Sequence, residues 1–291
     1  MANLILDGIR DHMKAIGVIA GLTIKEALRK KVYLLAILIG VIFCLLSILP
    51  MFMGWSFKSV GPREREVYFP VGLVVFLGIP MIRFFSTLLT VLLATGTLAG
   101  EIEKGSLLVI LPRPISRLQV LFGKWLGVMA VMCLSILLWS GLLWASLYVQ
   151  LGYSYHSIML AACVLMLYPV FYSSLSLFFS AFTGQILAAA LTLLCGGIAW
   201  SEGILVFIGK LPFVHLHLLV HLGKACAYVV PMSNADRWVE KSLGSLSPSN
   251  LMMMPNRVAT RPADAFDLVY IVVWTCIVLA ATVQIFQKRD L

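Results

Sequence analysis

Long apolar runs dominate this sequence, and short segments between them hold most of its charge. Crossing the roughly 30 Å hydrocarbon core of a bilayer takes about 20 helical residues. Backbone groups in lipid must find their hydrogen bonds within the segment, so such runs form helices. We therefore expect an all-α integral membrane protein with six transmembrane helices, over residues 32–54, 72–99, 119–149, 157–182, 185–208 and 266–286.

Composition excludes a soluble globular domain, because 61% of the residues are hydrophobic and only 12% are charged. The formal net charge of +9 lies beside the apolar runs rather than along one soluble face. Anionic lipid headgroups are therefore the expected counterpart, not nucleic acid. Five of the six cysteines fall inside the expected spans and none forms a CxxC pair, so they are expected to pack as small apolar residues rather than to bind a metal.

Basic residues orient the chain. Arg29, Lys30 and Lys31 directly precede the first run, and Lys288 and Arg289 follow the last. Positive charge stays on the cytoplasmic side, and six spans bring both termini to the same side. We expect both termini in the cytoplasm, with no cleaved signal peptide, because the first 31 residues lack a compact apolar block.

Residues 1–31 form an expected cytoplasmic segment. Thr23 and Glu26 have the spacing of a capping box, which predicts a short helix that begins there. Apolar and basic residues then alternate at helical spacing, as in a helix that lies in the inner headgroup layer. We interpret this helix as an elbow packed against the bundle; the alternative is a charged flank that only orients the first span.

The segment between the second and third spans, residues 100–118, is charged and interrupted by prolines. Glu101, Glu103 and Lys104 open it, and Pro112 and Pro114 break any continuous helix. The short apolar piece left between these breaks suits docking into a groove of another protein. The alternative is a solvated loop whose charges only fix the topology.

The order of residues in this loop resembles a family pattern that reads E-x-E-x-G-(S/T), then L-x-R-P-x-S-R, then G-K. Here the matching residues are Glu101, Glu103, Gly105, Ser106, Leu111, Arg113, Pro114, Ser116, Arg117, Gly123 and Lys124. This pattern resembles the membrane subunits of type-2 ATP-binding-cassette (ABC) exporters. The segments at 23–31 and 286–291 are also similar to the termini of that family.

The resemblance implies a six-helix permease domain over 32–291, an elbow helix, a cytoplasmic coupling helix in the loop 100–118, and short re-entrant or external helices within an extracytoplasmic segment, 209–265. The implied partners are a separate cytoplasmic ABC ATPase, a second copy of this permease or a related one, and membrane lipids, in the cytoplasmic membrane of a prokaryote. ATP and Mg would be bound by the ATPase. The chain itself has no GxxxxGK(S/T) loop, and we expect it to be neither an enzyme nor a holder of a cofactor.

The resemblance also points to the residues that would couple the permease to the ATPase. Glu101, Glu103 and Lys104 are candidates for charge pairing at the bundle edge, and Arg113 and Arg117 for binding partner carboxylates or lipid phosphates. The full expected set is Glu101, Glu103, Lys104, Gly105, Ser106, Leu107, Arg113, Pro114, Ser116 and Arg117.

Two ionisable residues lie inside expected spans, Arg83 in the second and Glu202 in the fifth. Counted from the inner surface, both lie roughly 25 Å deep, so they are candidates for an intramembrane ion pair. The alternative is that Arg83 extends outward and Glu202 sits in the mouth of the bundle.

Other polar groups suggest competing functions. His215, His217 and His221 lack the spacing of a helical metal site, and Met252, Met253 and Met254 add only soft ligands, so no metal is expected. An exporter subunit is the leading hypothesis. The alternatives are a non-transporting membrane anchor or force transmitter on the same scaffold, and an intramembrane enzyme that would use Ser140 or Glu202.

Overall fold

The computed structural model describes residues 2–29, 31–46, 64–103, 116–151, 156–209, 231–244 and 263–288. These parts are helical and contain no strand, which is consistent with the expected all-α class. The helices are α1 (Ala2–Arg29), α2 (Lys31–Leu46), α4 (Glu64–Glu103), α6 (Arg117–Leu151), α7 (His156–Leu165), α8 (Leu167–Ser180), α9 (Gln185–Gly209), α11 (Met232–Leu243) and α13 (Ala265–Lys288).

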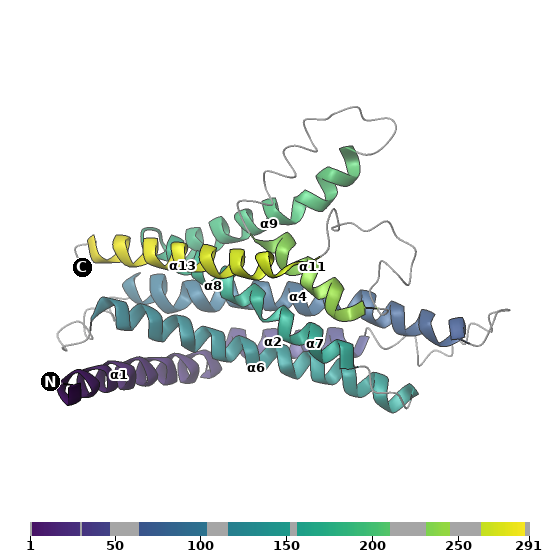
Figure 1. Ribbon diagram of the computed structural model, residues 1–291, viewed down its shortest axis with the longest axis horizontal. Helices are drawn as coiled ribbons and strands as arrows, with labels where there is room; N and C mark the ends of the chain where they lie inside the picture. Colours follow the sequence, from purple (N-terminus) through teal and green to yellow (C-terminus); the bar gives the residue numbers. More distant parts are fainter. Residues whose placement is uncertain are drawn as a thin grey trace.

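The longest helices run along the long axis of the molecule, and both chain ends lie at the same end of it (Figure 1). α4 packs against α8, α6, α9 and α2, so it lies at the centre of the bundle. Large side chains fill the space between these helices, among them Trp139, Tyr168, Phe171 and Tyr172, all almost fully buried. The outer faces carry exposed apolar side chains, as expected where lipid is the solvent.

Four of the six expected spans coincide with helices long and apolar enough to cross a membrane, by length and composition alone. These are Leu77–Glu103, Arg117–Tyr148, His156–Ser180 and Ala265–Lys288. The fifth is represented by a shorter apolar stretch, Gln185–Gly197, and the first by α2. The count of six spans therefore stays a prediction.

A break divides the fourth expected span into α7 and α8 at Met166. Pro169 follows three residues later and has no N–H to donate to the carbonyl of Leu165, with which its ring also clashes. The proline is visible in the sequence, but the interruption of the helix lies three residues before it, at Met166.

The expected helix start at Thr23 is wrong. α1 begins at Ala2 and runs without interruption through Thr23 to Arg29. The Thr23 hydroxyl does not cap a free amide; it donates to the carbonyl of Ile19, at 2.9 Å, as threonine does within helices. The elbow itself, as a helix in the headgroup layer, stays a prediction.

α1 packs along the first half of α6 through two glycines. A Cβ added at Gly123 would lie 2.7 Å from Cβ of Ile19, and one at Gly127 would lie 2.6 Å from Cβ of Thr23. The same added atoms would lie 3.1 and 3.0 Å from backbone carbonyl oxygens of α1. Small residues four apart thus let the two backbones approach closely.

We expect Gly127→Ala to lower the thermal stability of the purified protein in detergent. The new methyl would have to push α1 away from α6, and overpacking of this kind typically costs about 1–3 kcal/mol. Gly141→Ala on the same helix is the matched control, because nothing lies within 4 Å of its added Cβ. The control should be neutral or stabilising, since alanine favours helix more than glycine does. Equal melting temperatures for both variants would contradict the close contact.

Candidate functional site: the base of the coupling loop

The residues on both sides of segment 104–115 gather at the end of the bundle that also holds the end of α13 (Figure 1). We define the loop base as Glu101 and Glu103, at the end of α4, with Ser116, Arg117 and Lys124, at the start of α6. Glu101, Glu103, Arg117 and Lys124 each make polar contacts with another helix, and Ser116 caps the start of α6.

Glu101 and Lys124 form an ion pair between α4 and α6. Lys124 is only 3% exposed and also donates a hydrogen bond to the carbonyl of Thr97, one turn before Glu101. A buried ammonium is costly unless it is paired and hydrogen-bonded, and here both conditions are met. The two helices that flank the loop are therefore fixed to each other at this point.

Glu103 connects the end of α4 to the start of α9. Its carboxylate Oε1 accepts a hydrogen bond from the backbone N–H of Gln185, at 2.7 Å. This is a capping contact, which satisfies a free amide and places negative charge at the positive end of the α9 dipole. Gly184 leaves room for it, since an added Cβ there would lie 2.6 Å from the same oxygen.

Ser116 and Gln119 begin α6 with a reciprocal capping box. The Ser116 hydroxyl accepts from the N–H of Gln119 at 3.2 Å, and the Gln119 side chain accepts from the N–H of Ser116 at 2.8 Å. The start of α6 is thus fixed directly after the loop.

Arg117 connects the start of α6 to the end of α13. Its guanidinium donates to the carbonyl oxygens of Phe286, at 2.8 Å, and Gln287, at 3.2 Å. It also lies over the Phe286 ring, 5.8 Å from the centroid. A cation at the C-terminal end of a helix satisfies carbonyls without helical partners and complements the dipole.

Comparison with protein families gives a match to the model described as ABC-2 family transporter protein, over residues 17–291. This match covers nearly the whole chain. The chain belongs to the ABC-2 family of transporter proteins. It is therefore a membrane permease component of an ABC transporter and a multi-pass membrane protein, and the family implies association with an ABC ATPase. A comparison with curated proteins found no match.

The structure of this ABC-2 permease places four of the ten expected coupling residues: Glu101, Glu103, Ser116 and Arg117. The other six lie outside the described residues: Lys104, Gly105, Ser106, Leu107, Arg113 and Pro114. Coupling to an ATPase therefore stays a prediction for all ten. For Arg117, the structure shows contacts within the chain, to the end of α13.

Sequence reasoning did not include Gln119, Lys124 or Gln185 among the site residues. The Ser-x-x-Gln spacing of Ser116 and Gln119 is a signal that could have identified the capping box. Lys124 was recognised only as part of the family pattern, and its burial is visible only in the structure. The amide of Gln185 carries no sequence signal, because any non-proline residue offers the same donor.

Arg83 of the ABC-2 permease is paired with Asp236 on α11. The side chain of Glu202 lies outside the described residues, so the proposed Arg83–Glu202 pair stays a prediction. Asp236 was missed because it falls in a segment that was expected to lie outside the membrane.

Within the described residues no group of three or more His, Cys, Asp or Glu is placed to hold a metal ion. The histidines at 215, 217 and 221 and the methionines at 252–254 lie outside those residues. The hydroxyl of Ser140, a candidate for the intramembrane enzyme, is fully buried and makes no hydrogen bond in the described part of the chain.

Proposed function

We propose that this chain is the transmembrane permease subunit of an ATP-driven exporter in the cytoplasmic membrane. A separate ABC ATPase would bind and hydrolyse ATP with Mg and would contact the coupling loop, residues 100–118, from the cytoplasm. Both chain termini would lie on that side. Movement of the loop would then change the packing of the bundle and open a path for substrate.

The loop base carries this proposal. The two ends of segment 104–115 are joined to α9 through Glu103, to α13 through Arg117, and to each other through Glu101 and Lys124. A force applied to the loop therefore has direct polar routes into four helices. Such a link is what a partner motor needs if its conformational change is to reach the transport path.

Exposed apolar side chains on the last helix support assembly with a second permease subunit or contact with lipid. They include Phe266, Val269, Val272, Val273 and Ile277 on α13. We propose a dimer of this chain, or of this chain with a related permease, together with two ATPases. The membrane would cover the rest of the apolar surface.

Charge reversal in the loop tests the ATPase contact. We expect Arg113→Glu to lower the amount of ABC ATPase that copurifies with the affinity-tagged permease at least about tenfold, which corresponds to about 1.4 kcal/mol of binding free energy. The physical reason is repulsion of the acidic groups that would bind this arginine. Lys288→Glu, a reversal of the same sign at the end of α13, is the control and should keep the ATPase. Unchanged copurification of the Arg113→Glu variant would argue against the coupling loop.

Transport itself is tested in sealed vesicles that contain the purified permease and ATPase. ATP-dependent movement of a candidate substrate supports the exporter. An ATPase that binds and hydrolyses ATP without moving any of a panel of lipids, peptides and drugs would favour the force transmitter instead.

A further inference from the structure

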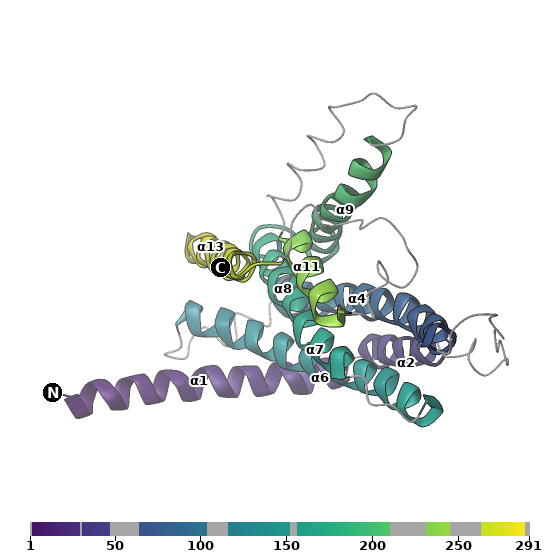
Figure 2. The same ribbon diagram turned by 45° about the vertical axis from the view of Figure 1, so that its right-hand side comes forward.

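α11 is a short helix whose consecutive residues Asp236 and Arg237 form ion pairs with two different helices. Asp236 pairs with Arg83 of α4, and Arg237 pairs with Asp267 of α13. Neighbouring residues of an α-helix point about 100° apart, so the two pairs leave α11 in different directions. The two ribbon views show α11 between α13 and α4 (Figure 1 and Figure 2), and one ion pair joins it to each.

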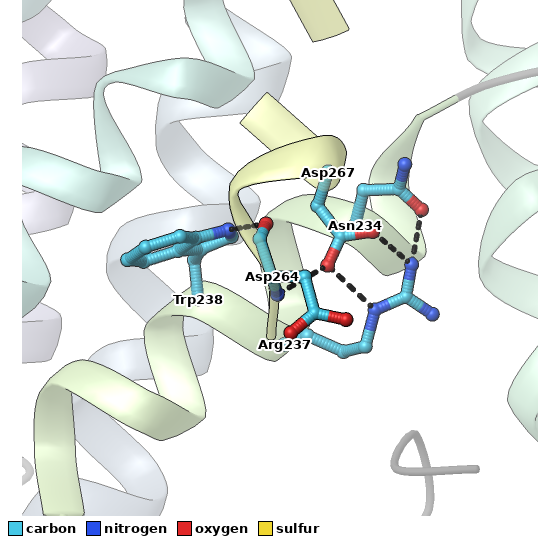
Figure 3. Close-up of polar contacts among 5 residues, drawn as sticks. All are labelled: Asn234, Arg237, Trp238, Asp264 and Asp267. Carbon is cyan, nitrogen blue, oxygen red and sulfur yellow. Dashed lines mark hydrogen bonds and ion pairs between the residues drawn. The ribbon is translucent and has the colours of Figure 1, made fainter. Parts of the chain in front are cut away.

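The pair with α13 is part of a larger polar network (Figure 3). Arg237 binds both carboxylate oxygens of Asp267, at 2.8 and 3.3 Å, and Asp267 is fully buried. One of these oxygens also accepts the N–H of Asp264, at 3.1 Å. Bidentate contacts between arginine and carboxylate are strong and directional, and this one also caps the start of α13.

Two further contacts join the same side of α11 to the segment before α13. The indole of Trp238 donates to the carbonyl of Asp264, at 3.2 Å, and Lys241 donates to the carbonyl of Ala263, at 3.0 Å. Lys241 also lies over the Trp238 ring, 4.5 Å from its centroid. α11 is thus joined to the start of α13 by several groups at once.

The ion pair with Arg83 of α4 involves fewer groups than the network with α13 and is more exposed to solvent. Asp236 accepts hydrogen bonds from the Arg83 guanidinium and from the Tyr168 hydroxyl, and Arg83 lies over the Tyr168 ring. The Arg83 and Asp236 side chains are 21% and 16% exposed, against 11% and 0% for Arg237 and Asp267. Water can therefore reach the first pair more easily than the second and replace its contacts when it opens.

Glu240 adds negative charge on the Asp236 side of α11, one turn later. Burial raises the pKa of the Glu240 carboxyl, and the charge of Asp236 raises it further. When Arg83 moves away, Asp236 loses its cation. Arg83 therefore balances the negative charge of Asp236 on the side of α11 toward α4.

Apolar packing holds α11 mainly to α7. Met232, Ala235, Val239 and Leu243 of α11 are buried in the same core cluster as Ile158, Ala161, Ala162 and Leu165 of α7. The packing on α7 and the network with α13 are both made with helices other than α4. Of the two ion pairs of α11, the pair with Arg83 is the more exposed and is the one expected to open.

α4 connects Arg83 to the loop base without a break. The helix is continuous from Glu64 to Glu103 and contains no proline after Arg83. Arg83 and Glu101 are 18 residues apart on it, which is about 27 Å along the helix axis. A shift of the loop base along this axis thus reaches Arg83.

We propose that Arg83 and Asp236 are positioning residues of the transport cycle, which form a latch that α4 releases when the loop base moves, while α11 stays attached to α7 and α13. The latch would control the opposite end of the bundle from the coupling loop. This proposal rests on the proposed function, because it assigns the movement of α4 to the ATPase. Ion pairs between helices have their best-attested role in fixing one arrangement against another, rather than in stability.

Spin-label distances in the assembled permease–ATPase complex test the latch. Labels at Phe84 and Ser242 measure α4 to α11, labels at Phe266 and Ser242 measure α13 to α11, and labels at Leu118 and Ile186 monitor the loop base, all in a background without the native cysteines. We expect ATP and Mg to lengthen the first distance by about 5 Å, one helical turn, and to leave the second unchanged.

The outcomes separate the two proposals. If the loop-base distance changes with ATP and the Phe84–Ser242 distance does not, the latch is wrong and the proposed function stands. If ATP changes none of the three distances, the proposed function fails and the latch fails with it. If both distances to Ser242 lengthen equally, α11 detaches as a whole, which also overturns the latch.

Variants separate a latch from a static brace. Arg83→Gln and Asp236→Asn should each give the longer Phe84–Ser242 distance without nucleotide, and the double variant Arg83→Asp with Asp236→Arg should restore the shorter one. A brace predicts instead that the single variants lose folded protein and that the charge-swapped variant does not respond to ATP. Either result would overturn the proposal.

Discussion

Replacing Glu101 by glutamine will destabilise the permease strongly. The change leaves the Lys124 ammonium, 3% exposed, without its carboxylate at the loop end of the α4–α6 contact. Removing one partner of a buried ion pair typically costs about 3–5 kcal/mol, because the remaining charge is uncompensated. Denaturant titration of the detergent-solubilised protein measures the loss in free energy of unfolding.

The double variant Glu101→Gln with Lys124→Met provides the control. It removes both charges, and a well-packed apolar replacement for a buried pair is often neutral. We expect it to recover most of the loss, so that the effects of the two single changes are far from additive. If Glu101→Gln alone costs less than about 1 kcal/mol, the pair does not hold the loop base together.

Asp267→Asn should have an effect of similar size at the other end of the bundle. Asp267 is fully buried and is the carboxylate partner of Arg237, as well as the acceptor for the N–H of Asp264. The amide keeps the shape but removes the charge, so Arg237 loses its counter-ion and about 3–5 kcal/mol of stability is expected to be lost. The same denaturant titration measures it.

Asp264→Asn is the matched control for that change. Asp264 is exposed, and the network uses its backbone N–H and carbonyl rather than its carboxylate. We expect a change within about 0.5 kcal/mol. Equal losses for both variants would show that the network does not depend on the buried charge of Asp267.

Apolar runs predicted most of the long helices, because a stretch that must cross lipid has few alternatives. The expected spans 119–149, 185–208 and 266–286 agree with α6, α9 and α13 to within two residues. α4 is longer than its run at both ends, since polar residues such as Glu64 and Glu101 continue the helix beyond the apolar part. Hydrophobicity identifies the part in lipid, not the end of the helix.

Local patterns of polar residues predicted less of the structure than the apolar runs did. The Thr23 and Glu26 spacing is the same for a capping box and for the inside of a helix, and only the surrounding chain decides between them. Ion pairs between residues far apart in the sequence could not be predicted either. Arg83 and Asp236 are 153 residues apart, and the sequence gives Arg83 no reason to prefer Asp236 over Glu202. A helical pattern with adjacent opposite charges, as in residues 232–243, is the signal that marks α11.

The position of Leu107 in the assembled complex tests the central claim, that this loop faces the cytoplasm and receives force from an ATPase. A photo-crosslinking residue at Leu107 should form a crosslink to an ABC ATPase in intact cells, and the same residue at Gly244, at the end of α11, should not. Labelling of Leu107→Cys by a membrane-impermeant reagent from outside, or the absence of any crosslink to an ATPase, would contradict the account.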